Sequence, residues 1–545
     1  MVDVSGPAAL ALRVAVVAGA LLALVVVARL DGARRQWGRR LRSRLLLGVP
    51  WGTLVVVALV SFVYFVVQGG HNSPRSVLAL PFYSWSYFYP LGMVLAPFSH
   101  AGLGHVTGNL IATATLAPLA EYAFSHFPTQ RGESSFDGRW RNPYVRAFVV
   151  FPLAVIAVGL CTSLLAWGPL IGFSGVVFAF AGYALVHYPL GTVVALSARD
   201  TVSTVYYSLQ DPVVTGTASS SFSVPWWADI AVQGHLLGLL LGASLGVLTL
   251  RRRDGGPSAL RLWVGATVAA SSLSLWALWW YDGADAYVLF RGPGLLLVLG
   301  VGLLLAAALR APDRSVRGVN LRTVGTLLLI LPLLTMGFVA VPLNLTTVDD
   351  TGIGAEQSVT VDGYTVGYAD GVVNPKSSVF DFSALGVSTA YETSGVVVVS
   401  ERRQLWSRAI SPGALASSGR RSVLLGSPGN EKRVTARRTG WNVNGAGTAY
   451  RVLLRAPDGP WTQVHQSGPQ RADLRIQNRS ITFTVEHGAF HLHVSGPNGT
   501  PTAIGEVPEP EENVTIGGLQ FERVRSALVA RTDNGTAVPV ARKEN

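Results

Sequence analysis

The sequence has a single cysteine, Cys161, and few charged residues, which make up 14% of its 545 positions. One cysteine cannot pair within the chain, so no intrachain disulfide stabilises any exported part. Hydrophobic residues make up 49% of the chain, and its mean hydropathy is +0.38. That is more apolar surface than one soluble core buries, and it is gathered into long runs. The composition therefore indicates a membrane protein.

Residues 1–343 contain no lysine, 23 arginines and 12 acidic residues. From residue 344 onward, 20 basic residues are nearly balanced by 19 acidic ones. The net charge of +12 therefore arises mainly in short loops such as 29–44 and 251–261. Arginine-rich short loops are typical of the cytoplasmic side of membrane proteins, so the positive charge does not indicate binding to nucleic acid.

Nine apolar stretches have the roughly 17 to 25 residues needed to cross a bilayer. They begin near Ala8, Trp51, Gly104, Tyr144, Ile171, Trp226, Leu262, Gly292 and Thr323. A tenth stretch, Leu190–Gln210, is weaker because it contains Arg199 and Asp200. The first stretch is followed by seven arginines rather than by a cleavage site, so we interpret it as a membrane anchor and not as a signal peptide.

The distribution of arginine predicts the topology. If the arginine-rich loops are all cytoplasmic, Leu190–Gln210 must cross the membrane, and residues 344–545 lie outside the cell. All five Asn-x-Ser/Thr sequons lie beyond residue 343, at Asn344, Asn478, Asn498, Asn513 and Asn534. Glycosylation acceptors are useful only outside the cell, which agrees with this orientation. The alternative is that a Ser/Thr-rich β domain produces sequons by chance.

The C-terminal region alternates short apolar runs with turn signals. Runs at 395–400, 451–454 and 481–485 are separated by Pro-Gly, Asp-Gly and Asn-Gly pairs. This spacing predicts an all-β module, similar to a sandwich. Three histidines, His487, His491 and His493, lie close together in it, and we interpret them as surface residues rather than as a metal site.

Polar residues inside apolar stretches are candidates for function, because they are costly in a membrane. His105 and Asn109 are spaced i and i+4 and so share one helix face; the alternative role is interhelical hydrogen bonding. Ser174, in Gly172-Phe-Ser-Gly175, precedes an apolar run, and a helix start can stabilise a developing oxyanion. The alternative is an ordinary N-cap serine followed by a packing glycine.

His235 lies beside a row of glycines with a four-residue period, Gly238, Gly242 and Gly246. Such a row lets a second helix approach closely. The predicted partner helix is 176–187. It carries a matching row of small residues, Gly175, Ala179 and Gly182, the first of which directly precedes it. That helix would then lie against the imidazole of His235, unless the histidine is only a buried structural residue.

Two acids near these residues are assigned no catalytic role. Glu121, sixteen residues after His105, is expected to accept hydrogen bonds that stabilise the bundle. Asp229 precedes His235 by six residues, a rotation of about 240° on a helix, and is expected to point away from it.

In order and spacing, His105 with Asn109, Gly172-x-Ser174-Gly175 and His235-x-x-Gly238 resemble the core of the rhomboid family of intramembrane serine proteases. The resemblance covers about residues 51–250 and implies a Ser–His dyad that cleaves peptide bonds in or near the membrane without a metal or cofactor. It implies that Ser174 is the nucleophile and His235 the base. The implied oxyanion hole consists of His105, Asn109 and the Ser174 N–H, with Gly172, Gly175 and Phe178 in support.

The chain departs from the family pattern at four places, two of which are Gly234 in place of the alanine usual before the base and the charges in the fifth crossing of the core, Leu190–Gln210. Phe178 stands where members often have a tyrosine beside the histidine, so stacking is retained and a hydroxyl is lost. Residues 68–97 lack the Trp-Arg pair found in this loop of many members. His100 aligns with a histidine common just before the first motif.

These observations predict an all-α polytopic bundle with a rhomboid-like six-helix core and a C-terminal extracellular β-rich domain. The predicted parts are an anchor with a basic loop (1–50), the protease core (51–250), three further transmembrane helices (251–343) and the β-rich domain (344–545). The expected protein is a multi-pass cell-membrane protease that cleaves transmembrane segments of other proteins within the lipid bilayer. The alternatives are a catalytically silent rhomboid-like protein that binds membrane clients, and a transporter or receptor, although no inverted repeat is apparent.

Overall fold

The computed structural model describes residues 6–30, 34–128, 132–214, 222–251, 256–283, 285–311, 315–316, 319–348, 353–354, 357–375, 381–382, 387–388, 392–496, 501–532 and 534–544. The chain divides into two compact units. The first unit comprises residues 1–219, 225–281 and 287–346. The second comprises residues 347–545 together with two short segments from earlier in the chain, 220–224 and 282–286.

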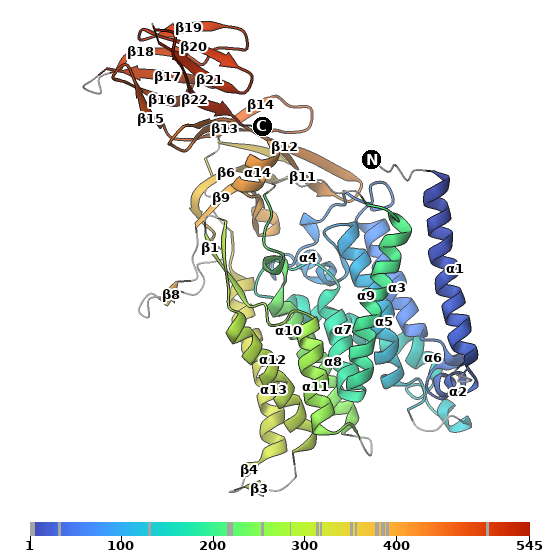
Figure 1. Cartoon of the computed structure of the whole chain (residues 1–545). Coiled ribbons are helices and arrows are strands. Elements are labelled where there is room, and N and C mark those ends of the chain that lie inside the picture. The colour runs from blue at the N-terminus through green and yellow to red at the C-terminus, as the bar shows by residue number, and fades with distance from the viewer. Residues whose placement is uncertain are drawn as a thin grey trace. The chain divides into compact units, whose positions relative to one another are not determined.

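The first unit is a helical bundle (Figure 1). Its main helices are α1 (Pro7–Leu30), α3 (Trp51–Phe62), α5 (Leu103–Phe124), α7 (Phe151–Leu164), α8 (Ser174–His187), α9 (Pro189–Gln210), α10 (Val232–Leu250), α11 (Ala259–Ser272), α12 (Arg291–Arg310) and α13 (Leu321–Leu345). Three shorter helices are α2 (Arg34–Arg44), α4 (Pro90–Leu95) and α6 (Pro143–Val145). Single π-helical turns, Val63–Val67 and Arg146–Val150, lengthen α3 and connect α6 to α7.

Five helical segments of the described residues are long and apolar enough to cross a membrane. They are Pro7–Val27, Pro143–Leu164, Val232–Leu250, Arg291–Arg310 and Arg322–Leu345. Two shorter apolar segments, Trp51–Val67 and Ser174–His187, lie among them in the sequence. The apolar window of α1 has no buried residue, as expected of an anchor that faces lipid. The chain is therefore a multi-pass membrane protein.

The weak stretch predicted at Leu190–Gln210 forms a continuous helix, α9, of 22 residues. At 1.5 Å per residue, its length is about 33 Å, which matches a bilayer core. Its two charged side chains neutralise each other, because Arg199 Nε and Nη2 donate to Asp200 Oδ1 at 2.9 and 2.7 Å. This pairing lowers the cost that two charged residues near the middle of α9 would have in a membrane.

Helices α8 and α10 pack together at backbone distance (Figure 1). A Cβ added to Gly238 would lie 1.9 Å from the Gly175 carbonyl oxygen, and one added to Gly242 would lie 2.0 Å from that of Ala179. From the other side, a Cβ on Gly182 would lie 2.2 Å from the Leu239 carbonyl oxygen. The predicted pairing of the two rows of small residues is confirmed, and only glycine fits at these crossings.

Glu121 ties α5 to the start of α3. Its fully buried carboxylate accepts hydrogen bonds from Gly52 N–H, Thr53 N–H and Thr53 Oγ1, each at 2.7 Å. His126 Nε2 lies 2.7 Å from the same carboxylate, and His126 Nδ1 accepts from Leu46 N–H at 2.8 Å, which leaves the proton on Nε2. A carboxylate at a helix N-terminus is favoured by the helix dipole. The expected structural role of Glu121 is confirmed.

Arginines bind carbonyl oxygens at helix C-termini on one end of the bundle. Arg44 donates to Tyr122 O and Ala123 O, and Arg146 donates to Ser125 O, all at the end of α5. Arg251 similarly donates to Ala308 O in the last turn of α12, at 2.8 Å. Cations are stabilised at helix C-termini, so these loop arginines contribute to packing as well as to orientation.

Three predicted spans begin or end elsewhere in the structure, and the one expected from Trp226 becomes α-helical only at Val232. The stretch expected from Ile171 becomes helical only at Ser174. The stretch expected from Leu262 to Trp280 leaves the helix after Ser272, and a hairpin of β1 (Trp279–Gly283) and β2 (Ala286–Leu289) follows. The chain then packs closely on α12, because the Trp276 carbonyl oxygen would lie 1.8 Å from a Cβ on Gly294.

The second unit is β-rich, as predicted. One sheet has the order β10-β9-β6-β5, a second runs β14-β13-β12-β22-β21-β20-β19 with β11 also on β12, and a third is β15-β16-β17-β18. The first sheet contains β5 (Ser358–Val361), β6 (Tyr364–Val373), β9 (Glu392–Ser400) and β10 (Leu405–Ile410). The second contains β11 (Arg420–Ser427), β12 (Asn430–Val443), β13 (Thr448–Arg455), β14 (Trp461–Gln466), β19 (Asn513–Ile516), β20 (Leu519–Val524), β21 (Ala527–Arg531) and β22 (Ala537–Lys543). The third contains β15 (Gln470–Ile476), β16 (Arg479–Glu486), β17 (Ala489–Ser495) and β18 (Pro501–Glu506).

The second and third sheets share one apolar core, which explains the sandwich-like sequence pattern. Ile481 and Phe483 from β16 pack in the same cluster as Phe521 from β20 and Leu528 from β21. Along β16 and β17, buried residues alternate with partly exposed ones, as expected for strands with one face on a core. A short helix, α14 (Pro412–Ser418), precedes β11.

The sequons differ in accessibility. Asn344 is 2% exposed, and its amide donates to Ala166 O and Ala340 O, so this position cannot accept a glycan in the folded chain. Asn478, Asn513 and Asn534 are exposed, and Asn498 lies outside the described residues. The sequence prediction was therefore wrong to count Asn344 with the other acceptors.

Candidate active site

Ser174 and His235 are brought together by the close packing of α8 and α10. Ser174 is the first residue of α8, and His235 lies in the first turn of α10. The Ser174 Oγ and His235 Nε2 atoms are 2.9 Å apart, which is hydrogen-bonding distance. Gly175 directly follows Ser174, and Gly238 lies three residues after His235. Because these two glycines are in contact, the glycine interface sets the distance between Ser174 Oγ and His235 Nε2.

The imidazole of His235 is held by an aromatic ring. The Phe178 ring is stacked on it, with centroids 4.1 Å apart and planes 12° apart. Among the described residues, His235 Nδ1 is buried and has no hydrogen-bond partner. The stacking that the resemblance implied at Phe178 is therefore present, and the ring is oriented by packing rather than by a carboxylate.

Asp229 makes no hydrogen bond to His235, but not for the reason inferred from the sequence. It belongs to a 3-10 turn, Trp226–Asp229, that ends before α10 begins at Val232. An argument from rotation around one continuous helix was therefore wrong. Asp229 does line the same cavity as His235.

Gly172, His105 and Asn109 meet on the other side of Ser174. Gly172 has a φ of +125°, which favours glycine, and a Cβ at this position would lie 2.6 Å from the His105 ring. The same Cβ would lie 3.7 Å from Asn109 Nδ2. That amide nitrogen is buried and has no hydrogen-bond partner among the described residues. A buried amide without a partner is costly, so this donor is available for a ligand oxygen.

His100 braces the segment that leads into Ser174. Its ring nitrogen Nε2 lies 3.4 Å from the Phe173 N–H, and its ring contacts that of His105 edge-on at 5.0 Å. Gln68 in turn fixes His100, because its side chain accepts from His100 N–H and donates to His100 O, both at 2.8 Å. Gln68 was not identified as a candidate from the sequence. The only feature that could have indicated a role is its amide side chain at the end of an apolar run.

A cavity of about 500 Å³ opens beside Ser174 and His235. Its lining includes the expected residues His105, Asn109 and Phe178. It also includes polar residues that were not predicted to belong to the site: Arg199, Asp200, Ser203, Asp229, Ser272 and Ser274. Most of these come from α9 and α11, so the cavity has a polar wall facing a largely apolar one.

Residues 87–252 match the family model of the rhomboid domain. The chain contains a rhomboid domain. The resemblance drawn from the motifs is thereby confirmed, and the matched residues include every site residue expected from the sequence, from His105 to His235. A search of curated proteins and a search of solved structures each found no match.

No group of three or more His, Cys, Asp or Glu side chains that could hold a metal ion occurs among the described residues. In the β-rich unit, His493 Nε2 lies 2.8 Å from Glu486 and His491 Nε2 lies 3.8 Å from Glu506, so these histidines pair with separate acids.

Proposed function

We propose that the chain is an intramembrane serine endopeptidase that cleaves the transmembrane segments of other proteins. In this mechanism His235 Nε2 removes the proton from the Ser174 hydroxyl as Oγ attacks the scissile carbonyl carbon. The tetrahedral intermediate collapses with proton transfer from His235 to the leaving amine. Water then attacks the Ser174 ester, assisted by the same imidazole, and releases the second product.

The observation that carries the proposal is the 2.9 Å distance between Ser174 Oγ and His235 Nε2, next to a buried donor at Asn109. The rhomboid family includes inactive members as well as serine proteases, so the match alone does not carry the proposal. An inactive member has no need to keep a serine, a base and an amide donor around one cavity. The Ser174 N–H precedes the first hydrogen bonds of α8, which Val176 N–H and Val177 N–H donate to Phe173 O, and it adds a further donor beside the hydroxyl.

The substrate class follows from the surroundings of the site. The catalytic groups lie among apolar helices, so a client approaches through lipid and is held by apolar contacts. Peptide bonds within a regular helix are shielded, and a helix-breaking residue near the cut would expose them. We place the site and the β-rich domain toward the outer face of the cell membrane, in agreement with the arginine-rich loops.

The test is cleavage of a model transmembrane substrate by the purified full-length chain in liposomes. Wild type is expected to cut, and Ser174→Ala is expected to leave no activity. Ser197→Ala is a matched control, because Ser197 is an exposed serine on α9 that does not line the cavity. Absence of cleavage by wild type across several helix-destabilised substrates, or residual cleavage by Ser174→Ala, would contradict the proposal.

A further inference from the structure

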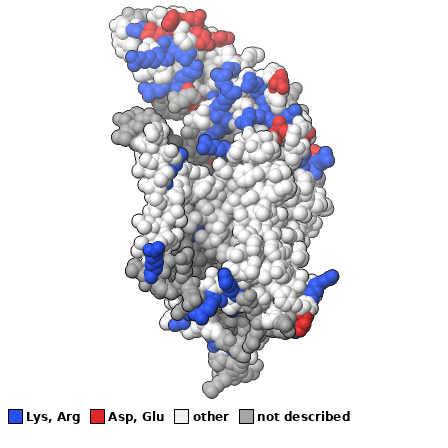
Figure 2. Space-filling view, turned by 90° about the vertical axis from the view of Figure 1, so that its right-hand side faces the viewer, with Lys and Arg blue, Asp and Glu red and all other residues white. Residues whose placement is uncertain are grey.

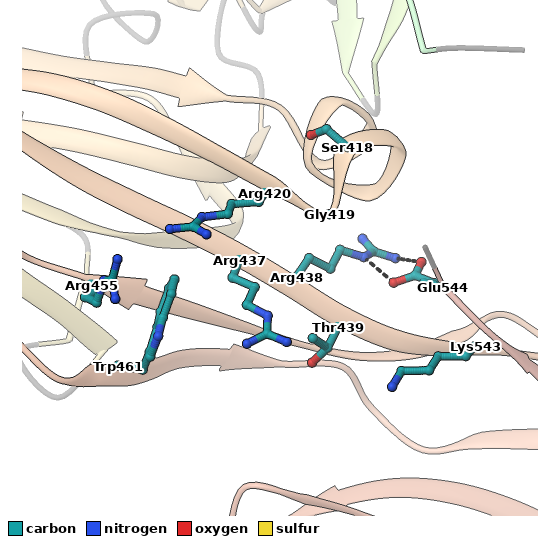
Figure 3. Close-up of a pocket in the computed structure, with 10 residues that line it drawn as sticks. All are labelled: Ser418, Gly419, Arg420, Arg437, Arg438, Thr439, Arg455, Trp461, Lys543 and Glu544. Atoms are coloured by element: carbon teal, nitrogen blue, oxygen red, sulfur yellow. Dashed lines mark hydrogen bonds and ion pairs between the residues drawn. The ribbon is translucent and has the colours of Figure 1, made fainter. Parts of the chain in front are cut away.

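The β-rich unit has a basic cavity that the proposed protease activity does not use. This cavity, of about 510 Å³, is lined by Ser418, Gly419, Arg420, Arg437, Arg438, Thr439, Arg455, Trp461, Lys543 and Glu544 (Figure 3). Five cations and one carboxylate give the lining a formal charge of +4. The region from residue 344 onward is nearly neutral as a whole, so this is a local segregation of charge. Figure 2 shows basic side chains gathered over one part of the β-rich unit.

The register of three strands places the arginines on one face. Arg437 on β12 is directly opposite Arg420 on β11. Thr435 lies two residues before Arg437 on β12, so both side chains are on the same face, and Thr435 is opposite Arg455 on β13. Arg455 is in turn opposite Trp461 on β14. Since side chains alternate between the faces of a sheet, all these groups project to the same side.

This arrangement places like charges next to each other without compensation. A directly opposed pair such as Arg420 and Arg437 is destabilising in an antiparallel sheet. Among the described residues, no carboxylate forms an ion pair with Arg420, Arg437, Arg455 or Lys543. The carboxylate in the cavity, Glu544, is already bound by Arg438 through two hydrogen bonds of 2.9 and 2.8 Å. Burial, with the nearby charge of Arg523, lowers the pKa of Lys543.

Trp461 orients two of the guanidinium groups. The Arg455 guanidinium carbon lies 4.9 Å from the centre of its ring, and that of Arg420 lies 5.9 Å away. Contact with an aromatic face restricts a long side chain before any ligand binds. Planar guanidinium groups held in this way bind the oxygens of a tetrahedral anion in pairs.

We propose that this cavity binds a dianionic phosphate ester, with Arg420, Arg437 and Arg455 as its main ligands. Two negative charges and three or more acceptor oxygens match several guanidinium groups that have no carboxylate of their own. The phosphate is carried either by a lipid head group or by a soluble molecule, and both present the same chemistry to the arginines.

The experiment is calorimetric titration of the full-length chain in neutral detergent with inorganic pyrophosphate and, separately, with short-chain phosphatidic acid. Both ligands are expected to bind wild type if the phosphate alone suffices, and only the lipid if the head group must be presented with its glycerol. Arg437→Gln is expected to weaken binding at least about tenfold, because a charge-assisted pair is lost. The matched control is Arg475→Gln, which removes an exposed arginine of β15 outside the cavity.

A melting curve separates loss of binding from loss of folding. Without ligand, Arg437→Gln is expected to melt no lower than wild type, because the substitution relieves repulsion from Arg420. With ligand, only wild type and Arg475→Gln are expected to gain in melting temperature. The proposal is overturned if neither ligand binds wild type, if Arg437→Gln binds as wild type does, or if Arg475→Gln weakens binding equally. None of these outcomes depends on Ser174.

Discussion

The tightest contact between α8 and α10 offers a direct test of how packing sets the catalytic distance. In Gly238→Ala, the new methyl carbon would start 1.9 Å from the Gly175 carbonyl oxygen. Carbon and oxygen atoms in such contacts stay about 3.3 Å apart, so the two helices must separate by ~1.4 Å at this point. The backbone carbonyl cannot rotate away without breaking the hydrogen bonds of α8.

This displacement is large compared with the tolerance of the site. Ser174 precedes Gly175 directly, and His235 lies one turn before Gly238, so both move with their helices. Added to the present 2.9 Å, the separation takes Oγ and Nε2 to about 4 Å, beyond hydrogen-bonding distance. Misplacement of a catalytic group by about 1 Å costs on the order of 100-fold in rate. We therefore expect turnover of Gly238→Ala to fall by that factor or more.

The assay is single-turnover cleavage of a model transmembrane substrate, together with a melting curve of the same sample. Gly300→Ala is the control, because a Cβ at Gly300 of α12 meets nothing within 4 Å. That substitution is expected to leave turnover unchanged and to stabilise the helix by about 0.5–1 kcal/mol. If folded Gly238→Ala turns over at the wild-type rate, the interface does not set the distance between Ser174 and His235.

Two further substitutions test the proposed roles at the site. His235→Ala is expected to abolish labelling of Ser174 by a fluorophosphonate probe in folded protein, because an unassisted hydroxyl is a poor nucleophile; undiminished labelling would exclude His235 as the base. Asn109→Ala is expected to slow turnover by on the order of 10² to 10³ while substrate binding persists, because one oxyanion donor is lost. A lower melting temperature with normal turnover per folded molecule would instead make Asn109 a structural residue.

The sequence predicted the close packing of α8 and α10, because the signals for it are local. Gly238 and Gly242 recur every four residues on one helix, and Gly175, Ala179 and Gly182 form a similar row on another. Each row can be recognised within a single segment of the sequence. Because both rows consist of small residues with similar spacing, the two helices are expected to pack against each other. That Ser174 lies beside His235 was expected from the resemblance to the rhomboid family, not from the two rows alone.

Other parts of the structure depend on distant segments and left no such signal. Gln68 and His100 are single polar residues 32 positions apart, and only folding brings them into contact. The inclusion of Arg199, Asp200 and Asp229 in the cavity depends on how α9 and the turn before α10 pack. The basic cavity of the β-rich unit arises from the register of β11, β12 and β13, which alternating patterns do not specify between strands.

The second unit is built from more than one part of the chain. Besides residues 347–545, it contains two segments from earlier in the chain. In one, Asp285 forms an ion pair of 2.9 Å with Arg408, and both side chains are mostly buried. In the other, the Phe222 ring packs against Gly413, where a Cβ would lie 2.3 Å from it. These contacts join short segments that precede α10 and α12 to the C-terminal region within one compact unit.

The last prediction tests whether α9 crosses the membrane, and it is practical because the chain has only one native cysteine to replace. After Cys161→Ala, one cysteine is introduced at a time, at the exposed positions Val214, Ser526 or Arg139. Val214 follows α9 and Ser526 lies in the β-rich unit, so a membrane-impermeant maleimide added to intact cells should label both. Arg139 lies in an arginine-rich loop on the other side of α7 and should be labelled only after permeabilisation. Labelling of Ser526→Cys but not Val214→Cys in intact cells would mean that α9 does not cross, because Val214 would then remain on the cytoplasmic side with the end of α8. Labelling of Arg139→Cys alone would reverse the whole orientation and contradict the argument from arginine-rich loops.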